Sequence, residues 1–110
     1  MSVLRVGRWM DRAEYDAMAA SGRVQPNLDG REMKHVTAPP DPDSFRAAAP
    51  GSVFAEFDLE DAQMTSGGRQ GWYILYGPNS LHGRNALRNG GPVVELPAAQ
   101  NIVITETKQL

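Results

Sequence analysis

Cysteine is absent from this chain, and histidine is limited to two residues, His35 and His82. A chain without cysteine has no disulfide, no thiol nucleophile and no cysteine-ligated zinc. Two histidines are fewer than zinc sites ordinarily use, so we expect no metal cofactor. The chemistry of this chain is therefore expected to rest on carboxylates, guanidinium groups, hydroxyls and aromatic rings.

The chain also lacks an excess of basic charge. Eleven lysines and arginines stand against thirteen aspartates and glutamates, for a net charge of −2. Nonspecific binding of duplex nucleic acid needs a basic face, and the basic residues here are scattered. No apolar run is long enough to span a bilayer, and the first residues lead straight into strand-like sequence without a signal peptide. We expect a domain cut from a longer protein, with no membrane segment and no direct contact with nucleic acid.

What is present suits one folded domain covering residues 1–110. Hydrophobic residues make up 41%, and 11 glycines with 8 prolines indicate many turns and short elements. Alternating apolar residues predict strands at 3–7, 34–38, 52–59, 72–76, 93–95 and 102–107. Capping residues and helical spacing predict short helices near 12–20, 41–49 and 81–89. The sum is an α+β domain with a small, largely antiparallel sheet.

The clearest strand is 52–59. Its apolar residues Val53, Ala55, Phe57 and Leu59 face one side, and Phe54, Glu56 and Asp58 face the other. We interpret the two acids as part of a half-solvated face.

Glu95 is the first candidate for chemistry. It stands in an otherwise apolar stretch behind the glycine pair Gly90 and Gly91, which allows close approach of the backbone to a ligand. Pro97 has no backbone N–H to donate to the hydrogen bonds between strands, so Glu95 is expected at the end or edge of a short strand. A carboxylate at this position is exposed to solvent, paired with another side chain, or used in catalysis. The end of a strand that follows a flexible loop is a place where a catalytic acid is expected.

Arg5 is the second candidate, on the same face of the first strand as Val3 and Gly7. Two interpretations stay open. The strand lies at the sheet edge with Arg5 in solvent, or Arg5 clamps an anion, because a guanidinium offers a planar fork to phosphate.

Two further strands carry polar or aromatic groups. His35 and Thr37 share one face of the strand at 34–38; a lone histidine is usually structural, but the hydroxyl makes a small polar pair. Trp72, Ile74 and Tyr76 share one face of the strand at 72–76, where aromatic residues are more often core than a stacking platform.

An arginine in the first strand, a histidine and threonine strand, an aromatic strand and a late glutamate follow one another in an order that resembles the ADP-ribosyltransferase family. Five stretches are also similar to the TreTu-type toxin domain at the C-termini of Rhs and other polymorphic toxins. They are VLRVGRWMDRAEYDAMAASGRVQ, HVTAPPDPDSF, GSVFAEFDL, GPNSLHGR and PVVELPAAQNI. The resemblance covers nearly the whole chain and implies an ADP-ribosyltransferase-like fold, NAD as co-substrate and no metal.

The resemblance also implies residue roles. Arg5 corresponds to the arginine that holds NAD through its phosphates and ribose, and Glu95 to the catalytic glutamate. Either His35 or Thr37 stands where the family has its Ser/Thr strand, which supports the pocket.

One of two adjacent aromatic residues, Trp72 or Tyr73, would stack on nicotinamide. Nothing in the sequence chooses between them.

The target follows from the same resemblance. Many arginine-modifying members carry a second Glu or Gln two residues before the catalytic one, and here that position is Val93, which argues against arginine as the acceptor. The closest likeness implies elongation factor Tu as the target and a block of translation, after delivery into the cytoplasm of the target cell.

The loops 25–33 and 67–71 are expected to contact the target. A toxin implies a neutralising immunity protein, which would cover the NAD cleft or these loops.

Two other functions compete. The first is a metal-independent ribonuclease toxin that uses His35 and His82 as acid and base, although the negative net charge suits RNA poorly. The second is a non-catalytic, β-rich binding module in which Arg5 and Glu95 form a structural ion pair.

Overall fold

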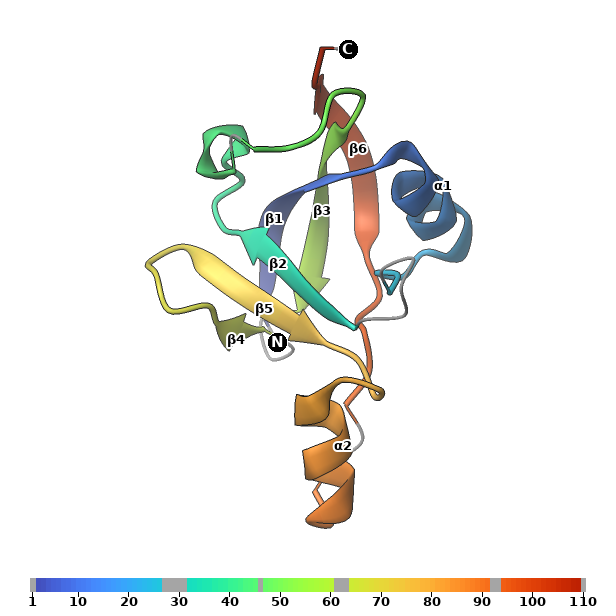
Figure 1. Cartoon of the computed structure of the whole chain (residues 1–110), viewed down its shortest axis with the longest axis vertical. Helices are drawn as coiled ribbons and strands as arrows, with labels where there is room; N and C mark the ends of the chain where they lie inside the picture. Colours follow the sequence, from blue (N-terminus) through green and yellow to red (C-terminus); the bar gives the residue numbers. More distant parts are fainter. Residues whose placement is uncertain (1, 27–31, 46, 61–63, 92–93, 110) are drawn as a thin grey trace.

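The fold is a single antiparallel sheet with helical segments around it (Figure 1). A computed structural model describes residues 2–26, 32–45, 47–60, 64–91 and 94–109. Within these ranges six strands pair in the order β4-β5-β2-β1-β3-β6, and every pairing is antiparallel. The predicted α+β class with a small antiparallel sheet is confirmed.

The elements follow the chain in a simple order. The strands are β1 (Val3–Met10), β2 (Met33–Thr37), β3 (Val53–Glu60), β4 (Thr65–Ser66), β5 (Trp72–Tyr76) and β6 (Gln100–Thr107). The helical segments are α1 (Arg12–Ser21), the 3-10 turn η1 (Pro42–Ser44) and α2 (Leu81–Arg88). Because β1 lies between β2 and β3, the interpretation of an edge strand with Arg5 in solvent is wrong.

Local signals at both ends of α1 act as the sequence predicts. The Asp11 carboxylate accepts a hydrogen bond from the Glu14 N–H at 2.7 Å, which satisfies a backbone donor of the first turn. Gly22 ends the helix in the left-handed region at φ +70°, and its N–H donates to the Met18 carbonyl. The predicted helix at 12–20 is thereby confirmed.

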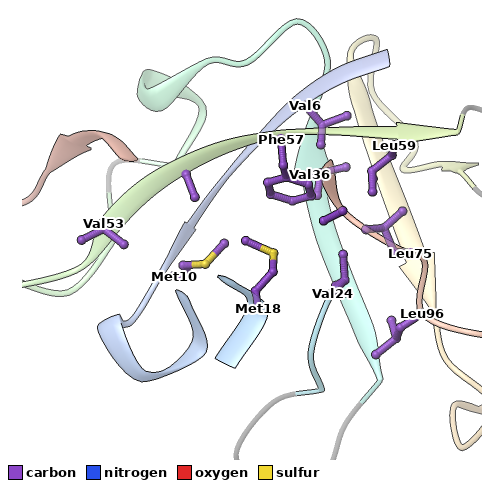
Figure 2. Close-up of a cluster of buried hydrophobic side chains, with 12 residues drawn as sticks. Val6, Met10, Met18, Val24, Val36, Val53, Phe57, Leu59, Leu75 and Leu96 are labelled. Atoms are coloured by element: carbon purple, nitrogen blue, oxygen red, sulfur yellow. The ribbon is translucent and has the colours of Figure 1, made fainter. Parts of the chain in front are cut away.

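The hydrophobic core lies on the face of the sheet that α1 covers (Figure 2). In the register between β1 and β3, Val6 lies opposite Phe57 and Met10 opposite Val53, so alternate residues of both strands point to this face. Met18 of α1 is 1% exposed and lies beside Met10 in Figure 2. The buried cluster consists of Val6, Met10, Met18, Val24, Val36, Val53, Ala55, Phe57, Leu59, Leu75, Leu96 and Ala99.

The other sheet face, which we call the open face, carries the remaining residues of the same strands. The register pairs Trp9 with Phe54, Gly7 with Glu56 and Arg5 with Asp58, so these six share that face. The predicted division of the strand at 52–59 into an apolar side and a side with Phe54, Glu56 and Asp58 is confirmed.

Three predicted elements differ from the structure. The stretch around Glu95 is not a strand over the described residues Val94–Pro97, because its carbonyls bond elsewhere: Leu96 O accepts from the Arg23 guanidinium and Pro97 O from the Val24 N–H. Val93 lies outside the described residues. In the described part of 41–49, which leaves out residue 46, the expected helix is only the one-turn η1, since Phe45 is extended and lines the pocket on the open face. The loop expected at 65–71 begins with β4, which pairs with β5.

The predicted helix after Ser80 is present as α2, which extends beyond the end of β5 (Figure 1). The Ser80 hydroxyl accepts a hydrogen bond from the Gly83 N–H at 3.0 Å, and His82 stacks on Tyr76 with ring centroids 4.3 Å apart. In the part of the chain that the structure describes, no helix has the length and apolar character needed to cross a membrane.

Candidate functional site

A pocket of about 460 Å³ opens on the open face of the sheet. Its floor is Gly7, which has no side chain. The strand registers align Trp72 of β5, Thr37 of β2, Gly7 of β1 and Glu56 of β3 in one row across the sheet. The missing side chain in the middle of that row leaves the space in which the Phe54 ring packs against β1, and Gly7 and Phe54 both line the pocket.

Aromatic rings form the walls of this pocket. Trp9 and Phe54 meet edge to face with centroids 5.4 Å apart, and the Trp9 indole N–H donates to the Pro42 carbonyl at 2.8 Å. That hydrogen bond holds η1 over the sheet, so that Ser44 and Phe45 also line the pocket. Phe45 is 51% exposed, which leaves a large apolar ring at the rim. Flat, largely apolar walls suit a planar ring better than a flexible polar chain.

Replacing Gly7 with alanine is expected to lower the free energy of unfolding by about 1–3 kcal/mol, because the floor of the pocket has no room for a methyl group. A Cβ there would lie 2.9 Å from Pro40 Cβ and closer still to the Phe54 ring. Urea unfolding measures the loss. The double variant Gly7→Ala/Phe54→Leu frees the ring position, so it should lose less than the sum of the single changes. Additive losses would contradict a steric cause.

His35 and Thr37 both line the pocket, but their polar atoms are used differently. Thr37 is 7% exposed; its hydroxyl donates to the Gly7 carbonyl at 3.4 Å and accepts from the Asp41 N–H at 3.1 Å. His35 is exposed, and among the described residues its ring has no hydrogen-bond partner. Thr37 therefore shapes the pocket wall, whereas His35 keeps both ring nitrogens available to a ligand.

The two adjacent aromatic candidates point to opposite faces. Trp72 lines the pocket, and the Arg69 guanidinium lies over its ring at 5.1 Å from the centroid. Tyr73 pairs with Val36 in the sheet and packs against the hydrophobic core. Of the two, Trp72 is therefore the one that can stack on a ligand in this pocket.

Arg5 lies on the open face below the pocket floor and is held by three oxygen groups. Its Nη1 donates to Asp58 Oδ1 at 3.2 Å and to the Asn101 carbonyl at 2.7 Å, and its Nε lies 3.6 Å from Glu56 Oε1. The side chain is 33% exposed, and its Nη2 makes no hydrogen bond with the described residues. Arg5 is thus positioned by acids, while Nη2 keeps donors that the described residues do not use.

Asp58 is the better-satisfied acid beside Arg5. Its Oδ2 accepts from the Asn101 side-chain amide at 2.8 Å. This hydrogen bond is the largest cause that holds the pKa of Asp58 below its ordinary value of 3.8; partial burial opposes it, and the Arg5 guanidinium adds to it.

Acid is therefore expected to remove a stabilising contribution that Asp58 makes to the folded state. A carboxylate whose pKa is lower in the folded protein than in the unfolded chain stabilises the folded state. This contribution is complete at pH values above the pKa in the unfolded chain, and it is lost as the pH falls through the pKa in the folded protein. The unfolding midpoint measured between about pH 6 and pH 2 should fall less steeply in Asp58→Asn than in the unchanged protein. Identical slopes would show that the Asn101 and Arg5 contacts contribute nothing to folding.

Glu95 lies apart from these groups. It is exposed, in the segment between α2 and β6, and it is not among the residues that line the pocket. Its neighbour Leu96 is buried in the core with Leu75 and Val24, on the other face of the sheet. The structure thus brings His35, Thr37 and Trp72 together in the pocket, whereas neither Arg5 nor Glu95 is among the residues that line it.

The remaining sequence candidates fall elsewhere. His82 is exposed on α2, so the two histidines of the ribonuclease hypothesis do not meet in the pocket. The acids paired with Arg5 are Glu56 and Asp58, which differs from the Arg5–Glu95 pair of the binding-module hypothesis.

Among the described residues, no group of three or more His, Asp or Glu side chains is arranged to hold a metal ion. Of the expected target loops, residues 27–31 lie outside the described residues, and 67–71 form the turn from β4 to β5.

The sequence pattern did not mark Trp9, Phe45 or Phe54 as residues of this pocket. The alternation in β3 did place Phe54 on the side opposite the core, which was the available signal. A glycine in a central strand such as Gly7 also marks a place where a ligand or another group comes close.

A protein-family model described as "TreTu toxin, C-terminal domain" matches residues 3–103. The match includes all the residues that line the pocket, together with Arg5, Glu56 and Glu95. Among curated proteins, none matches this sequence.

Proposed function

The chain belongs to the TreTu toxin C-terminal domain family, and on that premise we propose that this toxin domain transfers ADP-ribose from NAD to a protein of the target cell. The family match carries the proposal. The geometry supports it through one observation: a pocket with aromatic walls opens on the same face of the sheet that carries Arg5.

The proposed reaction replaces one bond with another at C1′ of the nicotinamide ribose. The bond from C1′ to the nicotinamide nitrogen breaks, and its electron pair leaves with the neutral nicotinamide. A nucleophilic side chain of the acceptor protein then bonds to C1′ and releases its proton to solvent. Positive charge develops on the ribose in between, so a nearby carboxylate lowers the barrier, as it does in glycoside cleavage.

The pocket residues suit the parts of NAD. Trp72 offers a flat face for the nicotinamide ring, with His35 as a donor or acceptor beside it. Arg5 has a free Nη2 for a phosphate or ribose oxygen, which a guanidinium binds well. The role of the carboxylate at the ribose is proposed for Glu95 by family resemblance, and its distance from the pocket lining makes this assignment the first to test.

The acceptor that the resemblance implies is elongation factor Tu, and its modification would block translation after delivery into the cytoplasm of the target cell. A cognate immunity protein would neutralise the domain by covering the open face, where it would exclude NAD. A complex that leaves the pocket open while blocking activity would contradict this mode of neutralisation.

The test is to incubate the domain with biotin-labelled NAD and a bacterial lysate and to blot for labelled protein. Excess unlabelled NAD and a heat-unfolded sample of the domain serve as controls. One strong band at the size of elongation factor Tu, lost in both controls, supports the transferase and nominates the acceptor. A different single band keeps the chemistry and changes the acceptor. A toxic domain that labels nothing overturns the proposal, and the integrity of cellular RNA would then be measured.

A further inference from the structure

The helix α2 buries very little of its surface. Gly83 is its one buried residue, and the helix extends away from the sheet beyond the end of β5 (Figure 1). Leu81 and Leu87 are 69% and 66% exposed, more than any other large hydrophobic side chain in the described part of the chain. Two leucines that a short helix leaves outside the core indicate a surface that another molecule covers.

The inner side of α2 is fixed to the end of the sheet. The His82 ring stacks on Tyr76, the last residue of β5, with centroids 4.3 Å apart. Gly83 lies so close to the Gly77 carbonyl that a Cβ there would collide with it. A helix of eight residues has little stability of its own, so these contacts hold it in one orientation.

The opposite side of α2 carries two leucines and two arginines. At about 100° per residue, Leu81, Arg84, Leu87 and Arg88 fall within about 120° of one another, and we call this side the outer face of α2. All four side chains belong to exposed residues. Neither guanidinium makes an ion pair or a hydrogen bond with the described residues.

The charge of the outer face is opposite in sign to that of the whole chain. Residues 77–91 contain two arginines and no aspartate or glutamate, whereas the chain has a net charge of −2. Arg84 and Arg88 are four residues apart, a spacing at which like charges repel until an anionic partner lies over them. The leucines beside them need apolar contacts, which a phosphate backbone does not offer. A groove on a protein, with apolar pockets and acidic side chains, satisfies both requirements.

The position of α2 brings such a partner to the face that holds the pocket. Trp72 lines the pocket, and Trp72, Ile74 and Tyr76 alternate along the same side of β5. Since Tyr76 carries the His82 ring, α2 begins where this side of β5 ends. A protein seated on α2 therefore lies beside the open face, where an acceptor of ADP-ribose has to be.

We propose that the outer face of α2 is a docking surface for the acceptor protein of the transfer. The acceptor receives Leu81 and Leu87 in an apolar groove and places acidic side chains against Arg84 and Arg88. This rests on the proposed transfer of ADP-ribose. Because α2 lies outside the pocket lining, it selects the protein that is modified and leaves the cleavage of NAD unchanged.

The experiment compares Leu81→Ser/Leu87→Ser and Arg84→Ser/Arg88→Ser with the unchanged domain, with purified elongation factor Tu as the acceptor. Three quantities are measured: the KM for the acceptor in labelling with biotin-labelled NAD, the release of nicotinamide without acceptor, and the unfolding midpoint. Each variant is expected to raise the KM for the acceptor by about tenfold or more. Nicotinamide release and the unfolding midpoint should match those of the unchanged domain. Arg12→Ser, which removes an exposed arginine of α1, is the matched control and should leave all three unchanged.

Salt separates the two kinds of contact. The defect of the arginine variant should shrink between about 0.05 M and 0.5 M salt, because exposed charges are screened, while the defect of the leucine variant persists. A defect in the arginine variant with a normal leucine variant overturns the protein groove, since a phosphate backbone would then account for the charges. A variant that loses nicotinamide release or lowers the unfolding midpoint assigns α2 to the pocket or the fold and also overturns the docking role.

Two outcomes separate the docking role from the proposed function. An active domain whose variants keep the original KM for the acceptor overturns the docking role alone. A domain that neither releases nicotinamide nor labels any protein overturns the proposed function, and the docking role with it. If the labelling test marks a protein other than elongation factor Tu, that protein is the acceptor in this experiment.

Discussion

Truncation of Glu14 to alanine is expected to lower the free energy of unfolding by about 3–5 kcal/mol, because it removes the carboxylate that two largely buried cations share. Glu14 Oε2 accepts from Arg8 Nε at 2.8 Å, and its Oε1 accepts from Lys34 Nζ at 3.0 Å. Lys34 is fully buried, and the side chains of Glu14 and Arg8 are 12% and 17% exposed. Chemical denaturation of the purified domain measures the loss.

Asp16→Ala is the matched control for this change. Asp16 lies on the same helix and pairs with Arg12 at 3.4 Å, but both side chains are more than 60% exposed. Exposed pairs of this kind contribute at most about 1 kcal/mol, so the control should stay near the unchanged protein. Glu14→Gln keeps the shape and one acceptor, so its loss should be smaller than that of Glu14→Ala. Equal effects of Glu14→Ala and Asp16→Ala would contradict a stabilising role for the buried cluster.

The loss in Glu14→Ala should also depend on pH. Burial is the largest cause that lowers the pKa of Lys34 below 10.5; Arg8 lowers it further, and Glu14 opposes both. Without Glu14 the folded pKa falls further. Between that folded pKa and 10.5 the unfolded chain binds more protons than the folded chain, so the stability of the variant rises with pH. Denaturation at about pH 7 and about pH 10 tests this, and a gap to the unchanged protein that does not narrow would contradict it.

Arg5→Ala is expected to lower kcat/KM for cleavage of NAD by about 10²–10⁴. Two charge-assisted hydrogen bonds to an anionic substrate contribute about 1.5–3 kcal/mol each, and each 1.4 kcal/mol corresponds to a factor of ten. The effect on folding should be no more than about 1 kcal/mol, since the ion pairs of Arg5 are partly exposed. Steady-state release of nicotinamide and urea unfolding of the same preparation separate the two effects.

Arg5→Lys tests whether several separate nitrogens are needed at this position. A lysine keeps the charge, but its single ammonium cannot replace Nη1 at Asp58 and Asn101 and also present the donors of Nη2, so it should recover only part of the activity. An Arg5→Ala protein with kcat/KM within about threefold of the original and reduced stability would assign Arg5 a structural role only.

The sequence alone predicted those features that depend on neighbours a few residues apart. Asp11 and Gly22 marked the ends of α1 because capping needs only a side-chain oxygen and a left-handed residue at fixed offsets. The alternation in β3 assigned Phe57 to the core side and Glu56 to the open side, because successive side chains of a strand point to opposite faces. The fold class followed from the number and length of such elements, and the family from five stretches in one order.

The tertiary structure decided what depends on which strands become neighbours. Local pattern does not specify that Trp72, Thr37, Gly7 and Glu56 share one row, because register is set by burial of the whole sheet face. Tertiary packing also places Phe45 in the lining of the pocket instead of in the predicted helix, and it buries Lys34 against Glu14. In the sequence, Glu95 was conspicuous because its neighbours are apolar. In the structure its neighbour Leu96 is buried in the core, and Glu95 is not among the residues that line the pocket. The local chain therefore determines the faces of each element, and the long-range packing of the sheet decides which of those faces together form a site.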